Sequence, residues 1–162
     1  MIPPLTIHTT EGRTVRAWDF KQKKNLVIIF LDSDCEPCRD FLRRLSERAQ
    51  ELRQKEALAL VVFLQSQPAS ETDVLPQGIV VGVDFSGRSA RAFLGDDALS
   101  SYGLARRGVF IADRYGEIFA QWTISGHEFP QIGEIVAWLD QIEISCEECF
   151  PPDPPADNRC DE

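Results

Sequence analysis

Apolar runs long enough to cross a membrane are missing from this 162-residue sequence. Its longest strongly apolar stretches, residues 26–31 and 57–64, are strand-sized, well short of the roughly 20 residues that a spanning helix needs. The N-terminus also lacks the basic and then apolar segments of a signal peptide. We therefore expect no membrane partner and a cytoplasmic location.

Basic charge is scarce and unevenly distributed. Lys and Arg number 17 against 26 Asp and Glu, a formal charge of −9, which disfavours nucleic acid as a partner. Residues 143–162 hold seven acids and one base and carry −6, which leaves −3 for residues 1–142. The sequence thus predicts one globular domain over 1–142 and an acidic, proline- and cysteine-rich tail over 143–162.

Cysteine and histidine are sparse as well. Five cysteines are too few for a small disulfide scaffold, and with two histidines there is no Cys–His hydrolase pattern, phosphate loop or zinc-protease helix. Four of the cysteines form two Cys-x-x-Cys units. In a reducing cytoplasm such pairs are more often redox-active or metal-binding than structural.

The periodicity of apolar residues predicts an α/β chain. The order is a hairpin within 4–18, a buried strand at 26–31, a helix over 36–55 and a buried strand at 57–63. A strand at 79–83, a broken helix over 90–102, an antiparallel pair at 108–112 and 117–124, and a helix from 131 to about 142 follow. This order is typical of a thioredoxin-like fold, a central mixed sheet flanked by helices with an N-terminal β-hairpin.

The first pair, Cys35 and Cys38, lies where a buried strand ends and a helix begins. Free backbone N–H groups and the positive end of the helix dipole stabilise a thiolate there. Pro37 fits the first helical turn because it loses no hydrogen bond. One sulfur can attack and the other, one turn on, can resolve the mixed disulfide. Half of a metal site and a pair of inert thiols are the alternatives.

Two segments resemble a known family. Residues 30–39, Phe-Leu-Asp-Ser-Asp-Cys-Glu-Pro-Cys-Arg, look like the active-site turn of redoxins, and residues 107–116 look like the Arg-Gly-Leu-Phe-Ile-Ile-Asp-x-x-Gly strand of peroxiredoxins. With the similar opening hairpin, they resemble the AhpC/TSA (alkyl hydroperoxide reductase/thiol-specific antioxidant) peroxiredoxin-like family over roughly 1–142. The resemblance implies an antioxidant that reduces hydroperoxides, in which Arg107 supports the thiolate.

The sequence departs from this family at the nucleophile. Peroxiredoxins carry Pro-x-x-x-Thr-x-x-Cys; aligning on Cys38 puts Cys35 at the Thr, and aligning on Cys35 puts Asp32 there. Thiol–disulfide reductases carry a cis-proline where this chain has Arg106-Arg107-Gly108. Exposure at the helix start favours Cys35 as nucleophile, and the peroxiredoxin alignment favours Cys38. We interpret Cys35 as the attacking and Cys38 as the resolving residue.

The second pair, Cys146 and Cys149, is predicted to follow the last helix, with Cys160 near the end of the chain. It could relay electrons to the Cys35–Cys38 disulfide, join that pair in a four-thiolate zinc site, or form a structural disulfide or unused thiols.

Three functions stay open at this point. The first is a peroxiredoxin-like peroxidase, the second a thioredoxin-like oxidoreductase acting on protein disulfides, and the third a non-enzymatic zinc-binding module. For the first two we expect no cofactor, a hydroperoxide or protein disulfide as substrate, and a thioredoxin-type or other thiol electron donor. A homodimer is compatible with either.

Overall fold

The computed structural model of the chain describes residues 1–33, 35–64, 75–100, 103–104, 106–124 and 128–149. The strands are β1 Thr6–His8, β2 Thr14–Arg16, β3 Asn25–Leu31, β4 Ala57–Phe63, β5 Ile79–Val83, β6 Leu99–Ser100, β7 Gly103–Leu104, β8 Arg107–Ala112 and β9 Ile118–Ile124. The helices are α1 Glu36–Glu47, α2 Ala49–Gln54, α3 Arg88–Leu94 and α4 Ile132–Cys149, with 3-10 turns η1 Ala17–Phe20 and η3 Asp96–Ala98. Within these residues no helix is both long and apolar enough to span a bilayer.

Seven strands form one mixed sheet, in the order β2-β1-β5-β4-β3-β8-β9. Strand β3 lies between β4 and β8 and runs parallel to β4, from Asn25 opposite Ala57 to Leu31 opposite Phe63, and antiparallel to β8. Every residue of β3 and β4 is buried, as expected for β-branched and other apolar runs covered on both faces. This arrangement confirms the predicted mixed α/β sheet.

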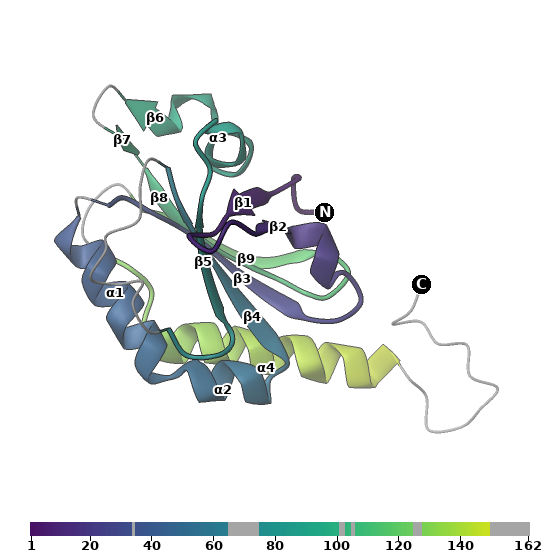
Figure 1. The fold of residues 1–162 in the computed structure, drawn as a ribbon. Coiled ribbons are helices and arrows are strands. Elements are labelled where there is room, and N and C mark those ends of the chain that lie inside the picture. Colours follow the sequence, from purple (N-terminus) through teal and green to yellow (C-terminus); the bar gives the residue numbers. More distant parts are fainter. Residues whose placement is uncertain (34, 65–74, 101–102, 105, 125–127, 150–162) are drawn as a thin grey trace.

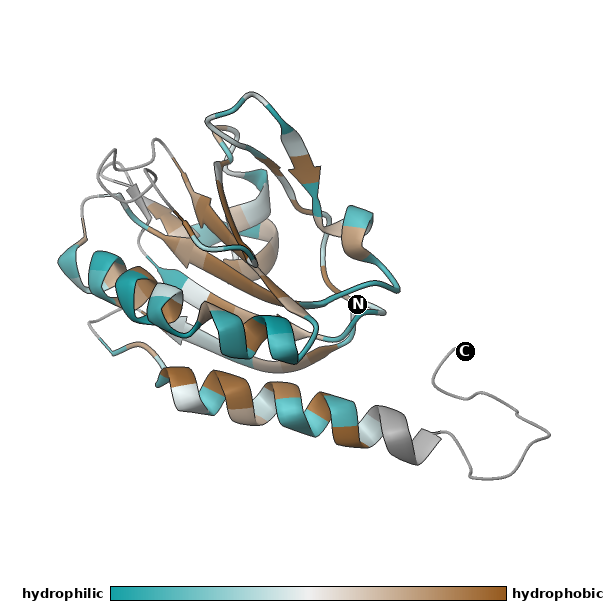
Figure 2. Cartoon of the chain, turned by 60° about the horizontal axis from the view of Figure 1, so that its bottom comes forward, coloured by the Kyte–Doolittle hydropathy of each residue, from teal (hydrophilic) through white to brown (hydrophobic). Residues whose placement is uncertain are grey.

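Helices cover both faces of the sheet (Figure 1). Side chains of α1, α2 and α4 pack with alternate residues of β3, β4 and β8 into one core cluster, and α3 packs with the other set of residues into a second. The central strands are strongly apolar, whereas the outer faces of α1 and α2 are hydrophilic (Figure 2). The Cys35–Cys38 pair belongs to the first cluster.

The structure corrects three predicted helices. The helix expected over 36–55 breaks at Arg48, whose backbone leaves helical geometry (φ −115°, ψ 21°), so α1 and α2 are separate. The predicted break in the helix over 90–102 is confirmed at Gly95, which takes a positive φ of 102° and ends α3, but residues 96–100 form η3 and β6 instead of continuing as helix. The last helix runs to Cys149 rather than to about 142, since no Pro or Gly interrupts it before Pro151.

The helix α3 lies very close to β8. A Cβ atom built on Gly108 would lie 2.5 Å from Leu94 Cδ2 and 2.9 Å from Phe110 Cε1. Only glycine fits without a shift, and this contact sets the position of the strand on which Arg107 is the first residue.

Candidate redox site

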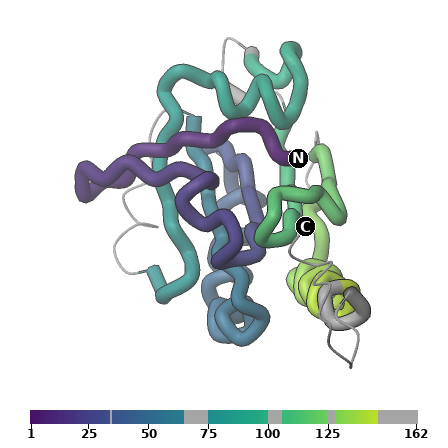
Figure 3. Tube along the Cα trace, turned by 90° about the vertical axis from the view of Figure 1, so that its right-hand side faces the viewer, coloured from purple at the N-terminus to yellow at the C-terminus, as the bar shows by residue number. Residues whose placement is uncertain are grey.

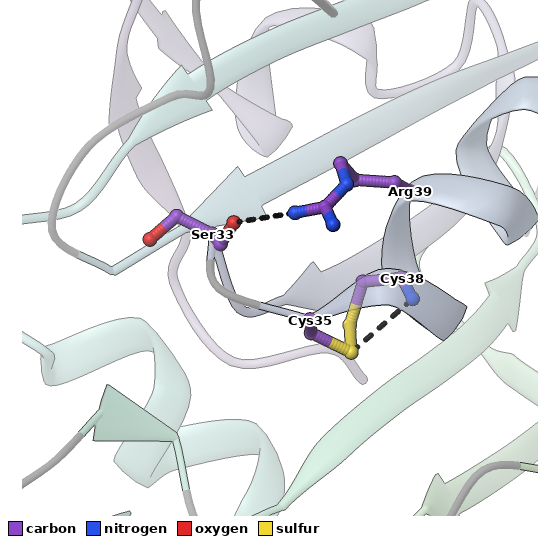
Figure 4. The surroundings of a disulfide bond; sticks show 4 residues. All are labelled: Ser33, Cys35, Cys38 and Arg39. Atoms are coloured by element: carbon purple, nitrogen blue, oxygen red, sulfur yellow. Dashed lines mark hydrogen bonds between the residues drawn. A yellow bond between two sulfur atoms is a disulfide. The ribbon is translucent and has the colours of Figure 1, made fainter.

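The Cys35–Cys38 disulfide closes the first turn of α1 (Figure 4). Cys35 is the N-cap residue in an extended conformation, its Sγ accepts a hydrogen bond of 3.2 Å from the Cys38 backbone N–H, and a proline lies in the first turn. The two Cα atoms are 5.2 Å apart, within the usual range for a disulfide. The helix start therefore supplies an N–H donor to Cys35 Sγ, which is what stabilises a thiolate.

The two cysteines differ in their surroundings. Cys38 is fully buried (0% exposed) and shares the inner face of α1 with Phe41 and Leu45. Cys35 retains 6% exposure at the cap. The predicted apolar face of this helix is confirmed, and Cys35 is the more exposed of the two residues.

Neighbouring side chains fix the turn in place. Arg39 Nη1 donates to the Ser33 carbonyl oxygen at 3.5 Å across the loop that leads into α1 (Figure 4). One turn further on, the Phe41 ring stacks on Phe129, with centroids 4.7 Å apart. Phe129 precedes α4, so this stack joins the disulfide helix to the start of the last helix.

Arg107 lies at the same end of the sheet as the two cysteines. It is half-buried and begins β8, one residue before Gly108, which pairs with Phe30 of β3. Side chains alternate along a strand, so Arg107 shares a face with Val109 and Ile111, which belong to the core cluster that contains both cysteines. Cys35, Cys38 and Arg107 are therefore on one face and at one end of the sheet.

The second pair lies at the opposite end of the molecule. Cys146 and Cys149 are in the last turns of α4 rather than after the helix, which corrects the expected position. One turn earlier, Glu143 Oε1 accepts hydrogen bonds from Asn25 Nδ2 and Arg114 Nη2, both at 3.0 Å. Asn25 is the first residue of β3, and a seven-residue strand spans about 20 Å. The fold thus does not bring the two Cys-x-x-Cys units together within one chain.

Within one chain, the four-thiolate zinc site and the relay from Cys146 and Cys149 to the first pair would both need these two units to meet, and both stay predictions. Among the residues that the structure describes, no three His, Cys, Asp or Glu side chains cluster closely enough to hold a metal ion. The role of the second pair, and that of Cys160, which lies outside the described residues, stays a prediction.

A buried carboxylate that the sequence did not single out lies at the end of β5. Asp84 is 7% exposed and accepts hydrogen bonds from the backbone N–H groups of Ser86 and Ser89 and from the Ser86 hydroxyl. Burial alone would raise the pKa of Asp84, but these hydrogen bonds outweigh it and hold the pKa below its ordinary value. The Asp-x-Ser spacing is a local capping signal, and Asp84 fixes the start of α3.

The sequence model of the AhpC/TSA family matches residues 1–121, which include the disulfide turn and Arg107. The chain belongs to the AhpC/TSA family. The match covers the whole mixed sheet up to the middle of β9. Together with two cysteines at disulfide distance, AhpC/TSA membership supports a thiol-dependent oxidoreductase. No curated protein matches this sequence.

Solved structures share the thioredoxin fold of this AhpC/TSA chain. The reduced 2-Cys peroxiredoxin of Plasmodium vivax is 13% identical, with a TM-score of 0.71 over 89% of this chain and 94% of that one. AhpC of Mycobacterium tuberculosis is 17% identical, with a TM-score of 0.70 over 89% and 91%. A putative thiol:disulfide interchange protein DsbE of Chlorobium tepidum is 19% identical, with a TM-score of 0.63 over 85% and 94%. These similarities establish the fold. The matched structures include proteins named as peroxiredoxins and one named as a thiol:disulfide interchange protein.

Proposed function

We propose that this AhpC/TSA protein reduces hydroperoxides through a cycle in which Cys35 attacks and Cys38 resolves. The observation that carries the proposal is the low exposure of the attacking residue: Cys35 is 6% exposed and Cys38 is not exposed at all. A small peroxide reaches such a sulfur with little rearrangement, whereas the disulfide of a folded protein needs an open surface around the nucleophile.

The cycle uses two thiols and one peroxide. The Cys35 thiolate attacks one oxygen of ROOH, the O–O bond breaks, and the alkoxide leaves as ROH after taking up a proton, so that Cys35 becomes a sulfenic acid. The Cys38 thiol then attacks the sulfenic sulfur, an S–S bond forms, and the hydroxyl leaves as water with the thiol proton. An external dithiol reduces the Cys35–Cys38 disulfide by exchange and becomes a disulfide itself.

Two features support Cys35 as the thiolate. Its sulfur already accepts the Cys38 backbone N–H at the positive end of α1. The Arg107 side chain leaves β8 on the face of the sheet that carries the two cysteines and at the same end, and a nearby cation lowers a thiol pKa. A guanidinium is also suited to holding the peroxide oxygens, because its donors form a planar fork.

Exchange with protein disulfides is the second candidate. The observation that favours it is the N-cap placement of Cys35 with Cys38 one turn on, which serves a mixed disulfide as well as a sulfenic acid. The two functions differ in the oxidant that the reduced pair accepts, and they share the same two residues.

The test compares oxidants on the reduced protein. We expect hydrogen peroxide or an alkyl hydroperoxide to oxidise the Cys35–Cys38 pair far faster than insulin disulfides do, measured by quenched-flow thiol trapping and mass spectrometry. In Cys38→Ser, dimedone should label Cys35 after one equivalent of peroxide. Faster oxidation by insulin than by peroxide would overturn the proposal in favour of disulfide exchange.

Arg107 gives the matched variant for the same assay. Arg107→Met should slow the peroxide reaction near neutral pH by about tenfold, because a cation beside a thiolate lowers its pKa by roughly one unit or more. The control is Arg106→Met, since Arg106 is bound to Asp97 at 2.8 Å and to the Leu94 carbonyl. Equal peroxide rates in the two variants would show that Arg107 does not contribute to the reaction. A thiol donor, a homodimer and a cytoplasmic location remain predictions that accompany this function.

A further inference from the structure

An apolar pocket of about 340 Å³ lies at the end of the sheet opposite the disulfide. The N-terminal segment 1–6, η1 and the turn between β8 and β9 form its walls, and Trp18, Phe20 and Tyr115 line it. The backbone N–H of Ile2 donates to the Gly116 carbonyl at 2.8 Å, which holds the first wall against the turn. Viewed from this side, the N-terminal segment and the β8–β9 turn lie near one another (Figure 3).

The redox chemistry does not use this pocket. None of its described lining residues is a cysteine, and the length of β3 separates it from Cys35. An aromatic, apolar pocket that is still open to solvent is nevertheless the usual sign of a binding surface. Trp18 is 69% exposed, so a large apolar ring remains uncovered at the rim.

The charges of the residues around the pocket indicate which kind of ligand would fit it. Among the described lining residues, four side chains are cationic, Arg16, Lys21, Lys24 and Arg114, and one is acidic, Asp113. Two of these cations already have carboxylate partners, Arg16 with Asp19 and Arg114 with Glu143. The ammonium of Lys21 lies 4.2 Å from the centre of the Trp18 ring. The occupant should therefore be apolar along its length and negatively charged.

We propose that residues 150–162 of this same chain occupy the pocket. This segment, Phe-Pro-Pro-Asp-Pro-Pro-Ala-Asp-Asn-Arg-Cys-Asp-Glu, has four prolines, one phenylalanine, and four acids against one base. Proline-rich segments bind between aromatic rings at low entropic cost because their extended conformation is preformed. The acids of the segment meet the lysines at the rim, and the prolines meet Trp18, Phe20 and Tyr115.

The end of α4 is within reach of the pocket. Glu143 of α4 contacts Arg114, and Arg114 lines the pocket. The helix continues for six residues to Cys149, which is about 9 Å at 1.5 Å per residue. Thirteen extended residues span about 40 Å, so the segment can turn back and cover the pocket. Tethering also gives it a millimolar effective concentration, which favours it over a second copy.

Zero-length cross-linking of the wild-type protein tests the proposal. A carbodiimide joins lysines to carboxylates in contact, and mass spectrometry maps the links. The described ion pair between Lys55 and Asp140 serves as the internal positive control. We expect links from Lys21 or Lys24 to acids of 153–162, and their loss at about 1 M salt, where charges are screened beyond roughly 3 Å.

The matched variant is Asp153→Lys/Asp157→Lys, which keeps the prolines and reverses the charge. It should lose the tail links while Lys55–Asp140 persists. As a second measurement, acrylamide should quench Trp18 fluorescence more strongly in this variant than in the wild type, with Trp18→Phe identifying the Trp18 signal. Quenching that is equal in both proteins would contradict docking at the aromatic rings.

Three cross-linking outcomes would also overturn the proposal. The first is a Lys55–Asp140 link without any tail link. The second is tail links spread equally over all lysines. The third is tail links that join isotope-labelled to unlabelled chains in a mixed sample, which would assign the pocket to a second copy. None of these depends on peroxide turnover, so the result is separate from that of the proposed function.

Discussion

The two Cys-x-x-Cys units of this protein share a spacing and little else. Cys35 and Cys38 lie at the start of a helix, beside a buried strand, with an N–H donor on the first sulfur. Cys146 and Cys149 lie at the end of a helix, where the dipole is negative and opposes a thiolate, and two glutamates separate them. The position on the helix, more than the motif, decides which pair is suited to attack.

Replacing one pair at a time should give the largest contrast. Cys35→Ser should reduce peroxide consumption to the buffer background, because Cys35 is the only cysteine among the described residues that caps the start of a helix. Cys146→Ser/Cys149→Ser should leave the first turnover of the reduced protein unchanged, measured as one equivalent of peroxide consumed in a rapid-mixing experiment. If the second variant also lost the first turnover, the two ends of the fold would be functionally joined.

The contribution of side-chain packing to stability should differ almost as strongly between the surroundings of the first and the second cysteine pair. Phe41→Ala removes a fully buried ring that stacks on Phe129, and should lower the free energy of unfolding by about 3–5 kcal/mol. Ile144→Ala, on α4 next to the second pair and 48% exposed, should change it by only about 0.5 kcal/mol. Urea unfolding of both variants measures the difference. Similar losses would mean that the end of α4 is as tightly packed as the disulfide helix.

A smaller effect is expected where α4 is bound to the sheet. Glu143→Gln removes the charge opposite Arg114 but keeps an acceptor for Asn25, so the free energy of unfolding should fall by about 1 kcal/mol. Amide exchange in the last turn of α4 should accelerate with it. The control is Gln141→Ala on the exposed face of the same helix; equal exchange in both variants would show that Glu143 does not hold this end.

The smallest effect should appear only in acid. The pKa of Asp84 is lowered in the folded state, so the unfolded state binds more protons below the ordinary value of about 3.9. The stability from Asp84 is therefore present above that pH and is lost as the pH falls through the lowered pKa. Urea unfolding of Asp84→Asn should show a flatter decline between neutral pH and pH 3 than the wild type. An identical decline would exclude Asp84 as a contributor.

Much of the fold follows from local patterns. The strands β3, β4 and β5 were predictable because a continuous run of β-branched and other apolar residues is a signal contained within a few residues. The break at Arg48 was not predictable, since the apolar spacing continues across it through Leu45, Ala49 and Leu52. The extension of α4 to Cys149 is not predicted by the sequence pattern, because the charge becomes acidic after 142 while the chain stays helical.

The candidate site, like the fold, was predictable only where its signal is local in the sequence. Cys35, Cys38 and Pro37 form a contiguous signal, and their placement at a strand-to-helix junction could be derived from the sequence alone. The distance between the two cysteine pairs depends on the direction in which α4 crosses the sheet, which no local pattern encodes. The pocket near Trp18 was likewise missed, because its walls come from three segments that are far apart in the sequence.

Both sulfurs of the first pair belong to the core cluster that α1 and α4 share with the sheet. Breaking their bond therefore alters the packed interior. The redox state of the pair and the thermal stability of the protein are consequently linked. By a thermodynamic cycle, the difference in unfolding free energy between the oxidised and reduced forms equals the difference in disulfide-forming free energy between the folded and unfolded chains. For a two-electron couple, about 1.4 kcal/mol corresponds to roughly 30 mV. Melting curves of the oxidised and the reduced protein thus measure how strongly the folded structure favours formation of the Cys35–Cys38 disulfide.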